Sequence, residues 1–480
     1  MTQTNDSPKH QSSLIVASPT ESNIINASNH DRIKFCLMQK VSQSEASSKN
    51  LFLGDRVAAN DFEEMALIGY SVTEQPSIEA GQTQTRQMHR DLYLNTNIPF
   101  CMVAVGVQGT GKSHSLGCFI ESCLLSNQVL TTNNIIRLHK PMTTLVLHYD
   151  ISPTSICEAS GLLKPSNTIK ELSVSFPKTE AVILVSPTYY RQRKQFYGNC
   201  CDVRPLLFRW QSLTADHITR FMRITSEDNQ LYVASFMNLL RKYQRQNKVP
   251  IFEEFINEVK EICNVRGQSG PLIQRITLLE SIIEESAKNR DIVKNSLDLA
   301  KAVSAGKKLL IVDLTDPLLS REEANGLFQV VTEHFRSLPV DGGKMLALDE
   351  AHKFMDGDKS DGLSQSIVNI ARLMRHDGIR LAVSTQSPLA LAPELLELVS
   401  VAILHHFHSR NWWDYLRQKL PLNNNDFDQV LSLASGHALV FCSNHSFSAS
   451  QQTLKCWLRD RLTADLGASR TSMKNIKYLA

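Results

Sequence analysis

The sequence predicts an α/β fold in which a mainly parallel sheet is flanked by helices and interrupted by a helical insertion. Apolar, β-branched runs recur along the chain, as in strands that helices cover on both faces. Helical segments separate these runs, as βαβ units require. A glycine-rich loop follows the first run, as a phosphate loop follows a buried strand. Seven of the predicted strands lie at 99–105, 143–149, 181–185, 309–312, 344–348, 379–384 and 402–404. An eighth is expected to end near residue 441.

The first predicted strand leads into Gly106-Val-Gln-Gly-Thr-Gly-Lys-Ser113, which fits the pattern G-x-x-x-x-G-K-[ST]. Glycines let such a loop direct its N–H groups at phosphate oxygens, and the next helix presents its positive end to the same anion. Lys112 would neutralise the β- and γ-phosphates, and Ser113 would hold Mg²⁺. The residues expected to bind ATP or GTP are Gly106, Gly109, Thr110, Gly111, Lys112, Ser113 and His114.

A second strand, 344–348, ends in the acid pair Asp349 and Glu350. Asp349 would join Ser113 in the Mg²⁺ shell, and Glu350 would polarise the attacking water. A base within hydrogen-bond reach of that water contributes about 10² to 10⁴ in rate. An acid pair after a strand can also be a polar helix start, but the phosphate loop favours the catalytic interpretation.

The strand at 379–384 finishes in Ser384, Thr385 and Gln386, and a polar residue there can sense the γ-phosphate. Three arginines surround this strand and compete for the role of an arginine finger toward a neighbouring subunit. We take Arg375 as the catalytic candidate and leave Arg372 and Arg380 open, since each can equally belong to a solvated helix face.

The segments LALDEAHKFM, IARLMRHDGIRLAVSTQSP, VSVAILHHFHS and SGHALVFCSN resemble the HerA-FtsK superfamily of ATPases, which includes DNA pumps and conjugative coupling ATPases. The resemblance covers about 95–150 and 305–445. It implies a RecA-like core of the catalytic-glutamate type that uses ATP and Mg²⁺ and commonly assembles as a hexameric ring. It also carries Lys112, Ser113, Asp349, Glu350 and Gln386 into the family's nucleotide roles.

Asp349-Glu-Ala-His352 also matches the DEAH box of two-domain helicases. Those helicases need a second RecA-like domain downstream with an arginine-rich closing motif. The chain after Asp349 is too short for that domain, and Ser-Thr-Gln stands where those helicases usually have Ser-Ala-Thr. The sequence therefore disfavours the helicase interpretation.

Net charge, cysteine spacing and the lack of long apolar segments limit the possible partners and the cellular location. The formal net charge of +3 is too close to neutral to indicate nucleic acid by itself. The ten cysteines form no C-x-x-C pair, which suggests a reducing compartment. His405, His406 and His408 close a strand without a carboxylate or cysteine partner, so we interpret them as structural or rim residues rather than a metal site. The polar start and the lack of a membrane span favour a cytoplasmic or nuclear protein.

We expect six regions: a mostly disordered polar tail (1–50), a lead-in whose 92–94 run feeds the first core strand (51–95), a first ATPase part (96–214), a helical insertion (215–300), a second ATPase part (301–445) and a C-terminal extension (446–480). Basic and aromatic residues alternate at 189–197 and 241–245. They could stack bases, but long side chains covering an apolar surface give the same pattern.

Two functions remain open from the sequence. The first is an ATP-hydrolysing motor, a homo-oligomer and candidate hexamer that moves DNA or another polymer. The second is a nucleotide-dependent switch or scaffold, in which slow turnover controls binding of a protein partner through 215–300.

Overall fold

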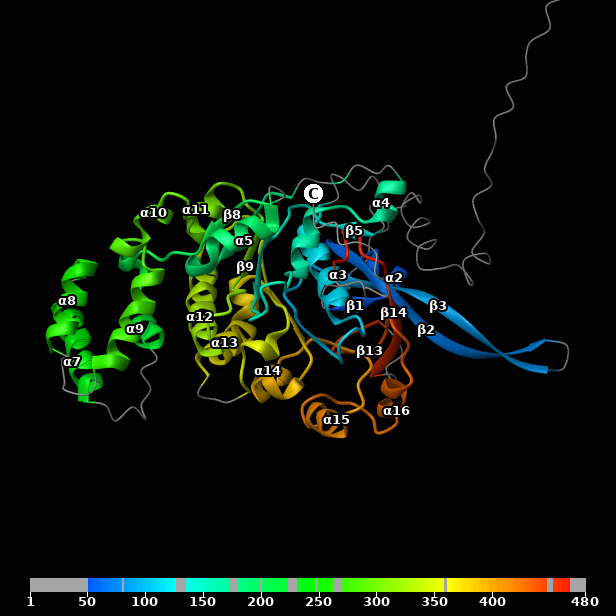
Figure 1. Cartoon of the computed structure of the whole chain (residues 1–480). Helices are drawn as coiled ribbons and strands as arrows, with labels where there is room; N and C mark the ends of the chain where they lie inside the picture. The colour runs from blue at the N-terminus through cyan, green and yellow to red at the C-terminus, as the bar shows by residue number, and fades with distance from the viewer. Residues whose placement is uncertain are drawn as a thin grey trace, which may run out of the picture.

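The computed structural model describes residues 51–79, 82–126, 135–172, 176, 179–198, 201–222, 231–246, 249–262, 269–357, 361–446 and 452–466. The polar tail expected at 1–50 lies outside these residues. Within the described ranges one sheet runs through the molecule in the strand order β1-β3-β2-β14-β13-β12-β4-β11-β10-β6-β9-β7-β8 (Figure 1). The described chain therefore contains one RecA-like sheet and no second one of the kind that a two-domain helicase needs.

The strands from β12 to β8 are parallel, and they include seven of the eight strands expected from the sequence. Their bounds are β12 (Val401–Leu404), β4 (Cys101–Val105), β11 (Ile379–Thr385), β10 (Lys344–Leu348), β6 (Thr143–His148), β9 (Leu309–Asp313), β7 (Ala181–Val185) and β8 (Val203–Pro205). The predicted α/β class with a mainly parallel, helix-flanked sheet is confirmed.

The remaining strands continue the sheet beyond β12 with antiparallel pairing. They are β13 (His437–Cys442), β14 (Thr453–Leu458), β2 (Met65–Glu79), β3 (Gln82–Asn95) and β1 (Leu53–Gly54), with β5 (Ile136–Arg137) paired to β2. The run 92–94 belongs to β3, which ends shortly before β4 begins, but in the sheet β3 lies several strands away from β4. The pairing of this run with residues 65–79 is not visible in a short apolar run.

Helices cover both faces of the parallel part of the sheet. α3 (Lys112–Leu124) covers one face, whereas α12 (Arg321–Ser337) and α13 (Gly362–Asp377) cover the other. The shorter helices of the core are α2 (Arg56–Ala59), α4 (Asn167–Glu171), α5 (Tyr190–Tyr197), α14 (Pro393–Glu397), α15 (Arg410–Arg417) and α16 (Asp426–Leu431).

Between β8 and β9 the described elements are helices. The helices are α6 (Ala215–Phe221), α7 (Leu231–Gln246), α8 (Phe252–Ile262), α9 (Ser269–Ile282), α10 (Arg290–Val293) and α11 (Leu299–Ser304). Helices α7 to α9 lie at one end of the molecule, and the β2–β3 hairpin projects at the other (Figure 1). The apolar positions with helical spacing point inward, as Phe236, Leu239, Phe255 and Val259 are all buried.

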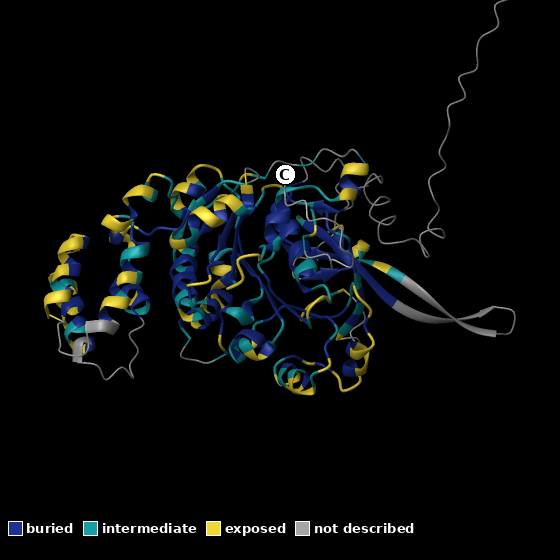
Figure 2. Ribbon diagram, viewed as in Figure 1, coloured by how far each residue is buried: buried dark blue, intermediate teal, exposed yellow. Residues whose placement is uncertain are grey.

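The central strand β4 shows why its sequence is apolar without alternation. Cys101, Val103 and Val105 belong to the core on the α12 and α13 side, whereas Met102 and Ala104 belong to the core on the α3 side. A strand that is buried on both faces needs apolar residues at every position. Figure 2 shows the resulting buried sheet between exposed helix surfaces.

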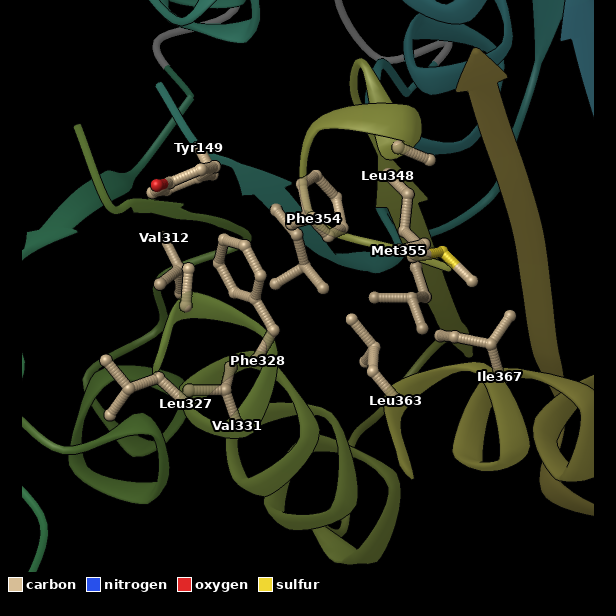
Figure 3. Close-up of a cluster of buried hydrophobic side chains, with 14 of the residues drawn as sticks. Tyr149, Val312, Leu327, Phe328, Val331, Leu348, Phe354, Met355, Leu363 and Ile367 are labelled. Atoms are coloured by element: carbon tan, nitrogen blue, oxygen red, sulfur yellow. The ribbon is translucent and has the colours of Figure 1, made fainter. Parts of the chain in front are cut away.

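Figure 3 shows the cluster that supports the strand carrying the acid pair. The rings of Phe328 in α12 and Phe354 pack edge to face, with centroids 4.7 Å apart. Such aromatic pairs add about 0.5–1.5 kcal/mol beyond the burial of their area. The cluster contains Tyr149, Val312, Leu327, Phe328, Val331, Leu348, Phe354, Met355, Leu363 and Ile367, all of which are buried. Among the described residues, no helix combines the length and the apolar character needed to cross a bilayer.

Candidate functional site

The carboxyl ends of three neighbouring parallel strands meet at one edge of the sheet. β4 leads into the phosphate loop, β10 ends before the acid pair, and β11 lies between them and ends directly before Gln386. Open α/β sheets bind ligands outside the carboxyl ends of their strands. A cavity of about 630 Å³ opens at this edge, and the predicted residues that line it are Gly109, Gly111, Lys112, Ser113, His114, Asp349, Glu350 and Gln386.

The phosphate loop is curled by two glycines in the left-handed region. The φ angle is 78° at Gly109 and 111° at Gly111, values that residues with a Cβ rarely adopt. Thr110 Oγ1 donates to the Val107 carbonyl at 2.7 Å, and Lys112 Nζ donates to the same oxygen at 3.0 Å. The loop therefore holds a buried amine at the start of α3, where the helix dipole also favours an anion.

His405 supports the loop from below, a role that sequence reasoning missed. Its side chain is fully buried, and the ring lies so close to the loop that a Cβ on Gly111 would stand 3.2 Å from His405 Cε1. His405 Nδ1 faces the His437 carbonyl at 3.2 Å, so this nitrogen carries the proton, and Nε2 accepts from Ser115 Oγ at 2.7 Å. Burial lowers the pKa of His405 to about 3, so the support is a neutral imidazole.

Asp349 is buried at the end of β10 and is held ionised. Ser384 Oγ donates to Asp349 Oδ1 at 3.0 Å and accepts from the Glu350 N–H at 3.1 Å, so one hydroxyl joins both acids to β11. Burial opposes ionisation of Asp349, but contacts with His148 and Ser384 outweigh it, and the pKa of Asp349 is lowered. An ionised carboxylate is the form that coordinates a divalent cation.

His148, at the end of β6, also lines this cavity and was not singled out from the sequence. Its Nδ1 lies 3.6 Å from Asp349 Oδ2, and within the described structure neither ring nitrogen has a hydrogen-bond partner although both are buried. A buried imidazole that contacts a carboxylate but makes no hydrogen bond is unusual in a native structure and calls for an explanation such as a ligand or a water molecule.

Glu350 combines a strained backbone with three polar neighbours. Its φ of 52° and ψ of 47° make it the one non-glycine residue with positive φ in the described part of the chain. Gln386 Nε2 donates to Glu350 Oε2 at 2.8 Å, His352 Nε2 lies 3.4 Å from that oxygen, and Lys112 Nζ lies 3.9 Å from Oε1. Burial and then the Asp349 carboxylate raise the pKa of Glu350. Backbone strain and raised acid pKa values both cluster at functional sites.

His114 lines the cavity and also contacts the C-terminal part of the chain. Its Nε2 donates to the Arg459 carbonyl at 2.8 Å, and its Nδ1 lies 3.1 Å from Asp465 Oδ2. Burial disfavours the imidazolium, but Cys118, Asp465 and the carbonyl outweigh it and raise the pKa of His114. The side chain therefore joins the first turn of α3 to the segment that follows β14.

The three candidate arginines do not share a location. Arg380 is buried, and its guanidinium donates to the carbonyls of Thr96, Asn97 and Gly378, which gives it a structural role. Arg372 and Arg375 are exposed on α13. None of the three is among the residues that line the described cavity, so the structure does not bring Arg375 to the site of its own chain.

The segment after β14 crosses α3 and is anchored there, which the sequence did not reveal. The buried carboxylate of Glu121 accepts hydrogen bonds from Arg459 Nη1 at 2.7 Å, from Thr463 Oγ1 at 2.6 Å and from the Thr463 N–H at 2.8 Å. A Cβ on Gly117 would stand 2.8 Å from the Arg461 guanidinium carbon, so this glycine admits the arginine. A glycine inside a helix is the available sequence signal, because it marks a close approach.

The basic and aromatic stretch in α5 is partly buried. Arg193 Nη2 donates to Asp313 Oδ2 at 2.5 Å, and the Tyr197 hydroxyl donates to the same oxygen at 2.7 Å. Both side chains are fully buried, so neither base stacking nor coverage of an exposed apolar surface describes them. Arg193 and Tyr197 are buried because both bind Asp313 on β9, which lies more than a hundred residues further along the chain. Arg191 and Lys194 remain exposed.

These groups fit a nucleoside triphosphate with Mg²⁺. The loop has no Cβ at Gly109 and Gly111, where phosphate oxygens would approach, and Lys112 supplies a buried cation. The Ser113 hydroxyl and the Asp349 carboxylate are hard oxygen donors that Mg²⁺ prefers. The cavity of about 630 Å³ lies within the usual range of about 300–1,000 Å³ for small-molecule sites.

No family model matches the chain, and no curated protein is significantly similar to it. Among solved structures it is similar to the plasmid coupling protein TrwB in complex with GDPNP, with 12% identity, a TM-score of 0.46 and coverage of 84% of this chain and 97% of that one. VirB4 of Thermoanaerobacter pseudethanolicus matches with 12% identity, a TM-score of 0.41 and coverage of 75% and 88%.

The genome packaging NTPase B204 of Sulfolobus turreted icosahedral virus 2, solved in complex with ATP-gammaS, matches with 19% identity and a TM-score of 0.24 over 31% of this chain and 67% of that one.

Proposed function

We propose that the chain is an Mg²⁺-dependent ATPase with Glu350 as its catalytic base. One observation carries this proposal: the strained Glu350 places its carboxylate 3.9 Å from Lys112 Nζ and 2.8 Å from Gln386 Nε2, inside the cavity at the phosphate loop. A phosphate-binding amine, a base and a polar sensor thus meet where a γ-phosphate and its attacking water would lie.

Each residue has a separate task in this proposal. The loop N–H groups and Lys112 hold the phosphates, Ser113 and Asp349 hold Mg²⁺, and Gln386 orients the water and Glu350 toward each other. When bound by Ser113 and Asp349, Mg²⁺ would supply positive charge against the negative charge that develops on the phosphates. The raised pKa of Glu350 strengthens it as a base, because a carboxylate with a higher pKa accepts a proton from water more readily.

Two substitutions separate binding from turnover. Lys112→Ala should lose ATP binding, whereas Glu350→Gln should retain binding and lose about 10²- to 10⁴-fold in turnover. Binding is measured by calorimetry and turnover by phosphate release. Asp414→Asn on the exposed surface of α15 is a matched control for loss of a carboxylate and should match the wild type in both assays. Parent-rate hydrolysis by Glu350→Gln would overturn the assignment of the base.

The preference for ATP, rather than GTP, comes from the motif resemblance. We propose further that hydrolysis in a homo-oligomeric ring moves DNA or another polymer, as the same resemblance implies. The exposed position of Arg375 on α13 is compatible with an arginine finger that acts on a neighbouring subunit. Mixing Lys112→Ala and Arg375→Ala protomers tests this, since a mixed ring would combine an intact site with an intact finger and recover activity that neither variant has alone.

The polymer is identified by steady-state ATPase rates with double-stranded DNA, single-stranded DNA and RNA. These are compared at low salt, because contacts to phosphates weaken steeply as salt rises. Strong stimulation by one polymer supports a motor on that polymer. A slow rate that is indifferent to all three favours the nucleotide-dependent switch instead.

A further inference from the structure

The cavity continues past the phosphate loop to a wall built by the β13–β14 hairpin. Ser435, Gly436, Trp457, Leu458 and Asp460 line this part. β13 runs antiparallel to β12, and His437 at its start pairs with Trp457 near the end of β14. The open end of the hairpin therefore lies at the same sheet edge as the phosphate loop.

The catalytic residues fix the direction in which a nucleotide would lie. Its γ-phosphate belongs at Glu350 and Gln386, and the phosphates follow the loop to the start of α3. The first turn of α3 is joined to the segment after β14 through His114, whose Nε2 lies 2.8 Å from the Arg459 carbonyl. The part of a nucleotide that extends beyond the phosphates thus meets the wall next to this junction.

Trp457 supplies the large aromatic surface of this wall, and its orientation is fixed by neighbouring rings. The indole plane is nearly parallel to the imidazole of His437, at 7° and a centroid distance of 5.9 Å, and it is tilted by 59° to Tyr70 at 6.4 Å. The side chain is half-buried and lines the cavity. A ring that is already ordered loses little conformational freedom when a ligand stacks on it.

Gly436 places no side chain beside the edge of the indole. Its φ is 82°, and a Cβ at this position would stand 3.7 Å from Trp457 Nε1. Any longer side chain there would extend over the cavity side of the hairpin or alter the turn that carries it. The turn thus combines a left-handed glycine with an aromatic ring beside it.

We infer that Trp457 and Gly436 form the nucleobase subsite and that a purine base stacks on the indole. The inference rests on the proposed ATPase function and adds to it a recognition residue outside the phosphate-binding and catalytic residues. A base with a large π surface gains the most from such a stack, so purine nucleotides bind more tightly than pyrimidine nucleotides at this site.

The test compares Mg-ATP with Mg-tripolyphosphate, which has the phosphates but no base. Trp457→Ala should weaken ATP binding by about 5- to 150-fold, since one base stacked on an aromatic ring contributes about 1–3 kcal/mol. Tripolyphosphate binding should stay within about twofold of the wild type. Trp457→Phe should fall between wild type and alanine, and Gly436→Asn, which tolerates the left-handed backbone, should weaken ATP selectively.

Intrinsic fluorescence gives a readout that does not depend on a destabilising substitution. ATP should quench wild-type fluorescence, and tripolyphosphate should not. The quenching should disappear in Trp457→Phe and persist in Trp412→Phe, which removes a half-buried tryptophan on α15 that does not line the described cavity.

Unchanged ATP affinity in Trp457→Phe together with persistent quenching would overturn the inference, as would equal weakening of ATP and tripolyphosphate. If the wild type binds neither Mg-ATP nor Mg-tripolyphosphate, the result contradicts the proposed ATPase function itself rather than the base subsite. The two failures are therefore distinguishable in the same experiment.

Discussion

Replacing Glu121 with glutamine tests how strongly the C-terminal segment is fixed to α3. The Glu121 carboxylate is fully buried and accepts hydrogen bonds from Arg459 Nη1, Thr463 Oγ1 and the N–H groups of Leu462 and Thr463. Glutamine has nearly the same shape but presents an amide NH₂ in place of one oxygen. Whichever way the amide is turned, a donor then faces donors, and the buried Arg459 loses its counter-charge.

Removing one partner of a buried ion pair costs about 3–5 kcal/mol, because the other charge stays in a dry environment. We therefore expect Glu121→Gln to lower the Tm by about 5 °C or more, as judged by thermal unfolding at pH 7. Asp414→Asn removes the partner of Arg410 in an exposed pair at 3.4 Å and should cost only about 0.3–0.5 kcal/mol. ATP affinity should also fall in Glu121→Gln, since the displaced segment follows Trp457 directly.

The pH dependence gives a second criterion. Burial opposes ionisation of Glu121, but Arg459 and Arg461 outweigh it and lower its pKa below the ordinary value of 4.5. A lowered pKa contributes stability that is present above pH 4.5 and is lost as the pH falls through the folded-state value. The difference in Tm between wild type and Glu121→Gln should hence shrink in acid. A variant that melts within about 1 °C of the wild type at pH 7 would refute the reasoning.

Three further outcomes are expected. Burial, followed by the carboxylates of Asp349 and Asp465, raises the pKa of Glu158 from 4.5 to about 7. Stability is thus lost as the pH rises from 4.5 to about 7, and Glu158→Gln should be up to about 3 kcal/mol more stable than wild type at pH 8 and equal to it below pH 4.5 in thermal unfolding. Glu350→Gly should be more stable than Glu350→Gln by about 1 kcal/mol in the same assay, because glycine relieves the left-handed backbone. Phosphate release should be lowered about 10²- to 10⁴-fold in both variants, and equal stability would contradict the strain. His405→Ala should weaken ATP and tripolyphosphate together by about tenfold in calorimetry, since the lost hydrogen bond supports the phosphate loop, and a selective loss of ATP would place His405 at the base instead.

The strands and the phosphate-binding residues could be predicted because their signals are local. Residues 101–105 are apolar at every position because helices cover both faces, and this pattern is visible in five consecutive letters. The phosphate loop and the acid pair are likewise short motifs with fixed spacing. A βαβ alternation already implies that their strands are parallel, whereas the order β4-β11-β10 that brings them together comes from the structure.

The supporting residues could not be predicted because their contacts join distant parts of the chain. Ser115 and His405 are separated by 290 residues, and Glu121 and Arg459 by 338. A histidine at the end of a strand has the same local pattern whether it supports a loop or lies at a rim. The same limit explains α5, where the burial of Arg193 is decided by Asp313 on another strand.

The antiparallel strands and the parallel strand β12 beside them therefore contribute to the candidate site. His405 follows β12 and packs against the phosphate loop. Gly436 and Trp457, from the β13–β14 hairpin, line the same cavity. The chain then returns across α3, where Glu121 fixes it by a buried ion pair. Lys112 and Glu121 lie on the same helix, so the C-terminal segment is attached to the element that carries the phosphate-binding amine of the proposed site. We therefore expect nucleotide binding and the attachment of this segment to depend on each other, and the ATP affinity of Glu121→Gln tests that expectation.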